Sequence, residues 1–332
     1  MPSAAFDVTG IGNAIVDVIA HADDAFLAAN GIEKGAMTLI DAARAEELYG
    51  RMGPGIEISG GSAGNTMAGL AALGGHGAYI GKVRDDQLGG VFRHDIRAAG
   101  VRFETQPSSE GAPTARCLIL VTPDAQRSMN TFLGACVELG PEDIDETLIR
   151  DSQVTYLEGY LWDPPRAKEA FRKAADIAHA AGRKVSLSLS DSFCVHRHHA
   201  EFLDLVERHV DILFANEAEI GALYGTDRFE DALEAVKGLG KVAALTRSEK
   251  GSVIVSGGSV VEVPAEPVER VVDTTGAGDL YAAGFLFGFT RGRAPELCGR
   301  LGAIAAAEII AHVGARPEAN LAELLRAKGI AA

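Results

Sequence analysis

The sequence predicts an α/β fold in which a doubly wound, mainly parallel sheet carries a small β-sheet lid. Short β-rich runs alternate with helical patterns over most of the 332 residues. The alternation fails in two regions, about 15–59 and 109–135, and both contain short β patterns. We therefore expect one domain over residues 1–332, with the lid inserted from these two regions. A structural flap or a dimer interface is the alternative role for the lid.

Each expected element follows from its hydrophobic period and its flanking turn residues. A hairpin turned at Gly257-Gly258 follows the last core strand, and long apolar helices come after it. Core strands are expected at 8–12, 77–83, 154–161, 185–189, 211–215 and 242–246, and the hairpin at 252–263. Lid strands are expected at 15–20, 37–40, 56–59, 115–121 and 127–132. Helices are expected at 63–73, 88–99, 166–181, 217–224, 231–239, 277–290, 295–312 and 319–327.

The charge balance argues against two classes of partner. The 31 Lys and Arg residues against 46 Asp and Glu give a formal net charge of −15, which repels nucleic acid and anionic lipid. The first residues lack the basic region and apolar core of a signal peptide, and no apolar segment reaches the roughly 18 residues that span a bilayer. We expect a cytoplasmic protein, monomer or homodimer, that binds small molecules rather than nucleic acid or membrane.

The segment from Asp273 to Asp279 carries the strongest chemical signal. Its sequence Asp-Thr-Thr-Gly-Ala-Gly-Asp precedes an apolar helical run. The main-chain N–H groups of Gly276, Ala277 and Gly278 would meet at the positive end of that helix and bind anionic oxygen. Asp279, one step into the helix, could then accept a proton from an attacking hydroxyl. An ordinary glycine-rich turn is the alternative interpretation.

Two segments near the N-terminus are candidates for binding a hydroxylated substrate. Gly60 and Gly61 let a backbone approach a ligand, and Asn65 in the first helical turn both donates and accepts hydrogen bonds. Asn13 and Asp17 follow a core strand, where α/β proteins assemble ligand sites, and Asp17 could accept bonds from two hydroxyls. The alternatives are a turn cap for Asp17 and a helix cap for Asn65.

Two further strand ends are candidates for binding phosphate and magnesium. Asn216 and Glu219 begin a helix three residues apart, so both can face a strand-end cleft and organise magnesium-bound water. Helix capping is the alternative for this pair. Thr246 and Gly251 flank a polar loop that could contact nucleotide phosphates, with a solvated turn as the alternative. The cluster of Cys194 with the histidines at 196, 198 and 199 lacks a second group at zinc spacing, which disfavours a metal there.

Other phosphate and nucleotide motifs are missing from the sequence. It contains no GxxxxGK[ST] loop and no protein-kinase signature. Gly10 and Gly12 lack the third glycine of a dinucleotide fingerprint, since Ile15 occupies that place. A dehydrogenase therefore has little support.

The ordered set of 12–17, Gly60-Gly61 with Asn65, Asn216 with Glu219, and 273–279 resembles the ribokinase/phosphofructokinase-B superfamily over nearly the whole chain. The resemblance implies a ribokinase-like fold and transfer of the γ-phosphoryl group of ATP, with Mg²⁺, to a hydroxymethyl oxygen. It implies Asp279 as general base, 276–278 as anion hole, and Asp17 and Asn65 as substrate ligands. Asp273 and Thr275 match a potassium position of some relatives.

Within the superfamily, the chain is most similar to adenosine kinases, on the segments 10–17, 60–65, 188–193 and 210–217. Arg127 matches a lid arginine that approaches phosphate in relatives, with a surface arginine as the alternative. Phe193 is a candidate for stacking on a base, with core packing as its alternative. Glu158 departs from the adenosine-kinase pattern toward that of sugar kinases. Leu161 replaces an expected aromatic, for which Tyr160 or Trp162 could compensate.

The expected reaction is the ATP-dependent phosphorylation of the 5′-hydroxyl of adenosine to AMP, a step of purine salvage. The first alternative is a ribokinase-type sugar kinase or a kinase for another nucleoside, which Glu158 and Leu161 favour. The second, from another class, is a non-catalytic nucleoside sensor that uses the same cleft.

Overall fold

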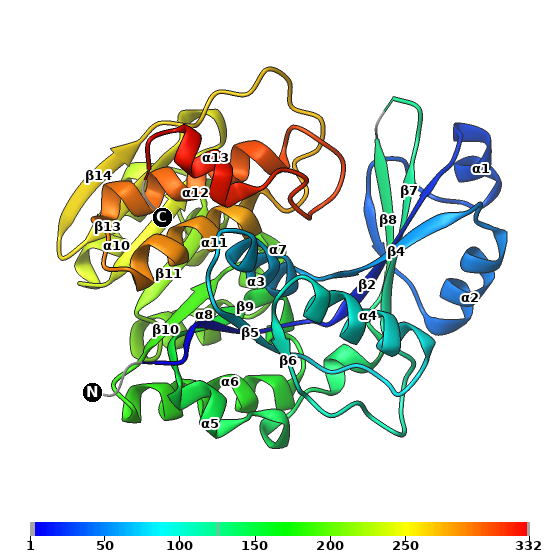
Figure 1. Cartoon of the computed structure of the whole chain (residues 1–332), viewed down its shortest axis with the longest axis horizontal. Coiled ribbons are helices and arrows are strands. Elements are labelled where there is room, and N and C mark those ends of the chain that lie inside the picture. The colour runs from blue at the N-terminus through cyan, green and yellow to red at the C-terminus, as the bar shows by residue number, and fades with distance from the viewer. Residues whose placement is uncertain (1–3, 125, 331–332) are drawn as a thin grey trace.

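The computed structural model describes residues 4–124 and 126–330. Within them, Figure 1 shows a large sheet among helices and a smaller sheet that projects to one side. The large sheet has the strand order β14-β13-β12-β11-β10-β9-β1-β5-β6. Pairing is parallel from β12 to β6 and antiparallel between β12, β13 and β14. The bounds are β1 Phe6–Ile11, β5 Gly77–Ile80, β6 Arg102–Phe103, β9 Ser152–Glu158, β10 Lys184–Ser188, β11 Ile212–Asn216, β12 Val242–Thr246, β13 Ser252–Ser256 and β14 Ser259–Val263.

Helices cover both faces of the large sheet, so side chains that alternate along a strand enter two different cores. On β11, Ile212 and Phe214 lie in one core, and Leu213 and Ala215 lie in the other. The first core packs against α3 Ser62–Ala72, α4 Gln87–Ala98, α11 Ala277–Thr290, α12 Pro295–Ile309 and α13 Leu321–Ala327. The second packs against α5 Glu146–Arg150, α6 Pro165–Ala180, α7 Ser192–Arg197, α8 His199–Arg208, α9 Glu217–Tyr224 and α10 Phe229–Gly238.

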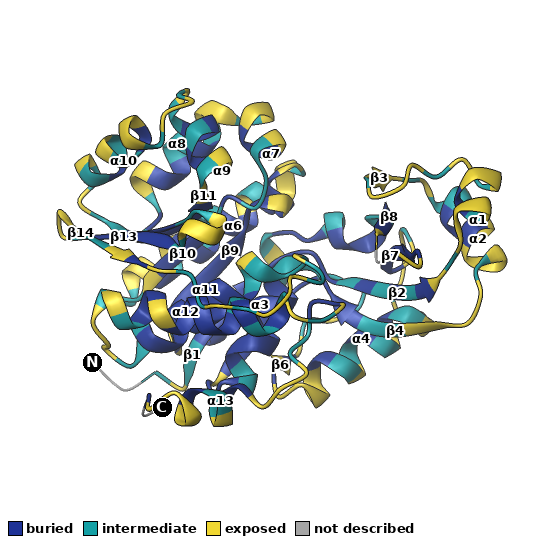
Figure 2. Cartoon of the chain, turned by 90° about the horizontal axis from the view of Figure 1, so that it is seen from above, coloured by how far each residue is buried: buried dark blue, intermediate teal, exposed yellow. Residues whose placement is uncertain are grey.

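The smaller sheet, here called the lid sheet, has the order β3-β8-β7-β2-β4. One of its faces buries Ala20 and Leu120 against Leu27 of α1. Figure 2 shows that helices α1 and α2 keep an exposed outer side at this end of the molecule. The bounds are β2 Ile15–His21, β3 Met37–Leu39, β4 Gly55–Gly60, β7 Ala115–Val121, β8 Arg127–Phe132, α1 Asp24–Ala29 and α2 Ala42–Arg51.

The predicted fold class, a doubly wound and mainly parallel sheet with a small β-sheet lid, is confirmed. Strand β9 ends at Glu158, three residues before the prediction, because Gly159–Trp162 form a 3-10 helix. The sequence pattern did not predict α1, α2, α5, α7, α8 or β6. Several of these helices are only one or two turns long, too short for a clear 3.6-residue period.

Helix α11 begins beside the carboxyl ends of the large-sheet strands, so its first turn lies near the ends of β10, β11 and β12. Its residues from Leu280 to Gly288 are all buried, which suits a helix packed between α12, α3 and the sheet. Burial of Leu280, Phe285 and Leu286 stabilises this position by about 1.5–3 kcal/mol each. Among the helices of the described chain, none combines the length and the apolar character that crossing a bilayer requires.

Candidate active site

A cavity of about 690 Å³ lies where the carboxyl ends of the large-sheet strands face the lid sheet. Open α/β sheets bind ligands at this edge. The cavity brings together most of the candidate residues of the sequence, from strand ends that are far apart in the chain. Of these it is lined by Asn13, Asp17, Gly61, Asn65, Glu158, Tyr160, Phe193, Asn216, Glu219, Thr246, Thr275, Gly276, Ala277, Gly278 and Asp279.

Asp279 is held in the first turn of α11 by two side chains of α3. Ser62 Oγ donates to Asp279 Oδ1 at 2.6 Å, and Asn65 Nδ2 donates to Oδ2 at 3.0 Å. Burial raises the pKa of Asp279, while these two donors and the charge of Arg316 lower it. The carboxylate therefore has a defined orientation and a pKa above that of an exposed aspartate.

The segment before Asp279 forms a glycine-rich turn at the start of α11, in which Ala277 N donates to the carbonyl of Thr274 at 3.2 Å. Gly276 is the N-cap of α11 with φ of 79°, a left-handed conformation that glycine adopts without strain. A Cβ on Gly276 would also lie 2.9 Å from the Cβ of Ala315. A Cβ on Gly278, by contrast, would meet no atom within 4 Å, since the open side of this residue faces the cavity. This loop can accept an anionic group at the positive end of the helix.

Asp17 lies on the cavity wall contributed by the lid sheet. Burial raises its pKa to about 6, with Arg316 and Arg127 lowering it and Asp279 raising it further. A Cβ on Gly60 would lie 2.4 Å from Asp17 Oδ2, so Gly60 leaves room for this carboxylate without lining the cavity itself. Gly61 has φ of 81° and packs against the carbonyl of Asn13.

Two residues that line the cavity each have a buried amide oxygen with no hydrogen-bond partner in the described protein. These oxygens are Asn13 Oδ1 and Asn65 Oδ1. A buried acceptor without a donor costs about 1–3 kcal/mol, and hydroxyl groups of a ligand would supply the missing donors. Together with Asp17, these oxygens form an acceptor-rich floor that suits a polyhydroxylated ring.

Glu158 is 1% exposed and receives three N–H groups of the protein. Asn13 donates from its backbone N at 3.2 Å and from Nδ2 at 2.8 Å, and the backbone N of Ala63 donates at 2.7 Å. Burial raises the pKa of Glu158 to about 7 against these donors. Although Glu158 also borders the cavity, its contacts orient Asn13 and the start of α3.

Asn216 and Glu219 form a reciprocal capping box at the start of α9. Glu219 N donates to Asn216 Oδ1 at 2.9 Å, while Asn216 N and Nδ2 donate to the Glu219 carboxylate at 3.0 and 2.6 Å. Burial raises the pKa of Glu219 to about 7, and Asp191 and Asp279 raise it as well. The capping alternative is thus confirmed, while both side chains still line the cavity.

The outer part of the cavity is aromatic and apolar. Tyr160 and Phe193 are 41% and 72% exposed. Facing them, the lid sheet contributes the apolar side chains of Ile15, Met37, Leu39, Ile119 and Met129. Trp162 and Leu161 are fully buried in the core and do not line the cavity, so Tyr160 is the aromatic of that segment available to a ligand.

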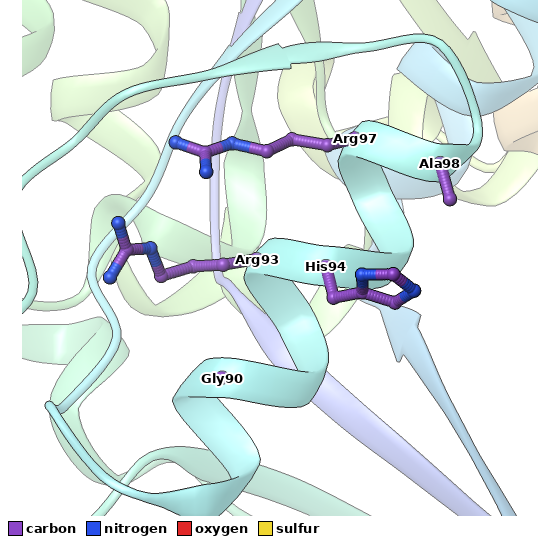
Figure 3. A pocket seen from close by; sticks show the side chains of 5 residues that line it. All are labelled: Gly90, Arg93, His94, Arg97 and Ala98. Atoms are coloured by element: carbon purple, nitrogen blue, oxygen red, sulfur yellow. The ribbon is translucent and has the colours of Figure 1, made fainter.

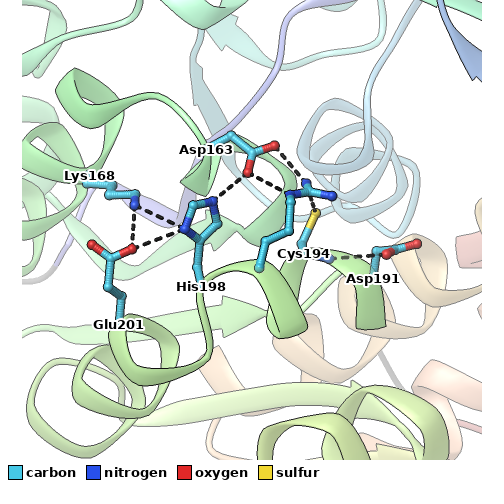
Figure 4. Close-up of polar contacts among 7 residues, drawn as sticks. Asp163, Lys168, Asp191, Cys194, His198 and Glu201 are labelled. Carbon is cyan, nitrogen blue, oxygen red and sulfur yellow. Dashed lines mark hydrogen bonds and ion pairs between the residues drawn. The ribbon is translucent and has the colours of Figure 1, made fainter.

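Figure 4 shows a network of polar contacts around His198, in which Asp163 and Cys194 also line the cavity. His198 Nε2 lies 2.6 Å from Asp163, and Nδ1 lies 3.2 Å from Glu201. Arg197 donates to Asp163 at 2.8 Å and to Cys194 Sγ at 3.3 Å. His199 contacts the carbonyl of Leu223 instead. No group of three or more histidine, cysteine or acidic residues within the described chain is arranged to hold a metal.

Besides Gly60, three candidate residues do not line the cavity. Arg127 of β8 is buried in an ion pair with Asp273, which also accepts from Thr275 N and Gly314 N at 3.0 Å each. Burial raises the pKa of Asp273, but the two N–H groups, the Thr275 hydroxyl and Arg127 together lower it. Arg127 pairs with one carboxylate oxygen of Asp273, and potassium at Asp273 and Thr275 stays a prediction. Gly251, with φ of 86°, packs against the carbonyl of Val263 as a turn residue.

Sequence reasoning missed two residues that the structure adds. Ser62, within the glycine turn at 60–65, donates to Asp279, and its place before Asn65 was the available signal. Arg316 reaches the base of the lid sheet from beyond α12, and no local motif marks it. A second hollow, on the outer face of α4, is lined by Arg93, His94 and Arg97 (Figure 3) and is unconnected with these residues.

A held carboxylate beside the turn at 276–278, here called the anion loop, is an arrangement that suits a phosphotransferase with an alcohol group as acceptor. Residues 37–321 match the pfkB family carbohydrate kinase model, and the chain belongs to this family. It is therefore a kinase of the pfkB, or ribokinase, type.

Solved structures and curated proteins of the same family differ in the activity that their names give. An adenosine kinase from Sinorhizobium meliloti is 60% identical, with a TM-score of 0.90 over 98% of this chain and 100% of that one. A probable sugar kinase from Rhizobium etli CFN 42 is 56% identical, with a TM-score of 0.91 over 98% and 99%. The adenosine kinase of Saccharomyces cerevisiae is 28% identical over 92% of this chain and 94% of its own.

Proposed function

We propose that this kinase transfers the γ-phosphoryl group of ATP to the 5′-hydroxyl of adenosine, giving AMP and ADP. The observation that carries the proposal is the position of Asp279, held by Ser62 and Asn65 next to the Gly276–Gly278 loop and in the same cavity as Asp17. A hydroxyl bound between Asp17 and Asp279 would lie beside a phosphoryl group held on that loop.

In the proposed reaction, Asp279 acts as general base. Its carboxylate accepts the proton of the 5′-hydroxyl as the new O–P bond forms and the bond from the γ-phosphorus to the β-γ bridging oxygen breaks. The N–H groups of the loop, at the N-terminus of α11, stabilise the charge on the migrating phosphoryl oxygens. The raised pKa of Asp279 makes its carboxylate a stronger proton acceptor than an exposed aspartate.

The acidic groups in the cavity fit magnesium held through water and phosphate. Glu219, Asp191 and Asp279 line one cavity. Burial raises the pKa of Glu219 to about 7, and the charges of Asp191 and Asp279 raise it as well. A divalent cation on the nucleotide phosphates would relieve this repulsion. Mg²⁺ keeps most of its waters and binds protein through few carboxylates, and we assign Glu219, oriented by Asn216, as the residue that holds it through water. Bound magnesium neutralises phosphate charge during transfer.

A nucleoside fits the cavity better than a bare sugar. The floor offers acceptor oxygens for a ribose, whereas the rim offers Tyr160, Phe193 and the apolar side chains of the lid sheet. Aromatic faces stack on a purine ring, and a free pentose would leave them in water. The adenosine kinase at 60% identity supports the same substrate.

A sugar kinase is the second candidate, favoured by the probable sugar kinase at 56% identity. The carboxylate of Glu158, the residue that pointed to a sugar substrate, already receives three protein N–H groups. That engagement weakens the support that Glu158 gives to a sugar. A nucleoside sensor without turnover would have no use for a buried base beside an anion loop.

The discriminating experiment is phosphoryl transfer from radiolabelled ATP to adenosine, inosine, cytidine, ribose and fructose, each with Mg²⁺. We expect adenosine to have the highest kcat/KM, with AMP as product. A higher kcat/KM for ribose or fructose would overturn the assignment in favour of a sugar kinase. Binding of adenosine without transfer to any acceptor would identify a sensor.

A further inference from the structure

Arg316 lies behind the cavity, where the lid sheet joins the main domain. Its Nη1 donates to the carbonyl of Gly64 in α3 at 2.9 Å. Its Nη2 donates to the carbonyl of Ser59 in β4 at 2.5 Å and to Ser59 Oγ at 2.8 Å. One guanidinium therefore ties a lid strand to the helix that holds Asp279.

Ser59 is fixed from its other side as well. Its backbone N and its Oγ donate to Asp95 Oδ2 at 2.8 and 2.5 Å. Ser59 pairs with Val16 in the lid sheet, so it sits beside Asp17 on the neighbouring strand. The position of Arg316 is thus coupled to the strand that carries Asp17.

The residues before Arg316 contact the anion loop and a second link to the lid sheet, the ion pair between Arg127 and Asp273. Gly314 N donates to Asp273, the partner of Arg127 in β8. Ala315 packs closely against Gly276. A Cβ placed on Gly276 would lie 2.9 Å from the Cβ of Ala315. Three consecutive residues, 314–316, therefore contact both links to the lid sheet, the anion loop and α3.

We propose that Arg316 is a positioning residue for phosphoryl transfer, which ties β4 to α3 and places a positive charge behind Asp17 and Asp279. The inference rests on the proposed role of Asp279 as base. Arg316 does not line the cavity and so acts through the two carboxylates rather than on the substrate. Its charge opposes the effect of burial on both carboxyl groups.

Other charged and titratable groups also face Arg316 and these carboxylates and enter any pH dependence. Asp95 on α4 acts on Arg316 more strongly than Asp17 and Asp279 do, and Tyr79 on β5 acts on it as well. Arg127 acts on Asp17, and Asp17 and Asp279 repel each other. Asp279 also raises the pKa of groups on β9, the 3-10 helix after it and α9. Those groups are Tyr156, Glu158, Tyr160 and Glu219.

The test separates the charge of Arg316 from its hydrogen bonds. Arg316→Gln removes the charge, and Arg316→Lys keeps it while losing the forked geometry. We expect the acidic limb of kcat/KM to move up by about 0.5–1 pH unit in Arg316→Gln and to stay in place in Arg316→Lys. Arg300→Gln, at an exposed position on α12, makes the same change of net charge as a control. Arg316→Met is the second neutral variant if the glutamine variant folds poorly.

A readout without turnover keeps this inference distinct from the proposed function. Urea unfolding from pH 5 to 8 should show that Arg316→Gln loses more stability with rising pH than Arg316→Lys, because its carboxylates ionise without a counter-charge. Parallel stability curves and coincident acidic limbs for the two variants would mean a purely structural role and would overturn the inference. Diverging stability curves without any transfer by the wild-type protein would mean that the proposed function has failed instead.

Discussion

Ser62 Oγ donates a 2.6 Å hydrogen bond to Asp279 Oδ1, across 217 positions of sequence. The bond joins the first residue of α3 to the first turn of α11. It orients the carboxylate that we propose as general base and holds down a pKa that burial raises. The orientation and the pKa of Asp279 therefore depend on a residue outside its own motif.

Replacement of Ser62 by Ala should shift the pH profile of the enzyme. Without this donor the pKa of Asp279 rises, so more of the base is protonated at a given acidic pH. We expect the acidic limb of kcat/KM to move to higher pH, with a smaller change on the alkaline side. Thr226→Ala, at a loop position outside the cavity, is a control hydroxyl deletion. An unmoved limb in Ser62→Ala would contradict the role given to this bond.

The two glycines of the anion loop should respond differently to Ala. In Gly276→Ala, the new Cβ would be strained by the left-handed φ of this residue and would collide with the side chain of Ala315. We therefore expect a loss of about 1–3 kcal/mol in the free energy of unfolding. Gly278→Ala meets open space and should leave stability intact. Its methyl group would instead crowd the phosphoryl group, with kcat/KM for ATP falling by about tenfold or more. Chemical denaturation and ATP kinetics check the pair, and normal kinetics of Gly278→Ala would argue against phosphate at this loop.

Replacement of Phe193 should test whether the nucleobase of the substrate stacks on this side chain. We expect Phe193→Ala to raise KM for adenosine by about five- to tenfold, which corresponds to a stacking contribution of about 1 kcal/mol, with little change in kcat. Initial-rate kinetics test this, and Tyr49→Ala provides a control at an exposed aromatic outside the cavity. An unchanged KM for adenosine would show that no base stacks on this side chain.

Glu158 should make the stability of the ligand-free protein depend on pH. Its folded pKa of about 7 lies above the ordinary 4.5, so its favourable contribution is complete below about pH 4.5 and is lost as pH rises through 7. The free energy of unfolding of wild type relative to Glu158→Gln should therefore fall by roughly 3 kcal/mol between pH 4.5 and 8. Urea titrations measure this difference. The exposed Glu249→Gln should show no such trend, and a flat difference for Glu158→Gln would refute the prediction.

Much of the fold was predictable because its strands and long helices carry clear periodic patterns. The apolar run after Asp279 became α11, and the short β patterns of the two irregular regions paired into the lid sheet. The short helices α1 and α7 could not be predicted in this way, because each spans only six residues. Their N-caps, Asp23 and Asp191, were the available signals.

The candidate site was predictable where a residue sits inside a motif at a strand end. Asp17, Asn65, Glu219 and Asp279 reached one cavity for that reason. Arg316 and the pairing of Arg127 with Asp273 could not be read from the sequence, because both depend on how distant segments approach each other in space. Glu158 was recognised, but its three donors come from residues 95 or more positions away.

The central claim is that the carboxylate of Asp279 deprotonates the acceptor hydroxyl. Its most direct test is single-turnover transfer from radiolabelled ATP to adenosine by wild type and Asp279→Asn, with adenosine binding measured in parallel. We expect the rate of transfer to fall by about 10²–10⁴-fold while the Kd for adenosine changes little. A transfer rate within a few fold of wild type would contradict the account.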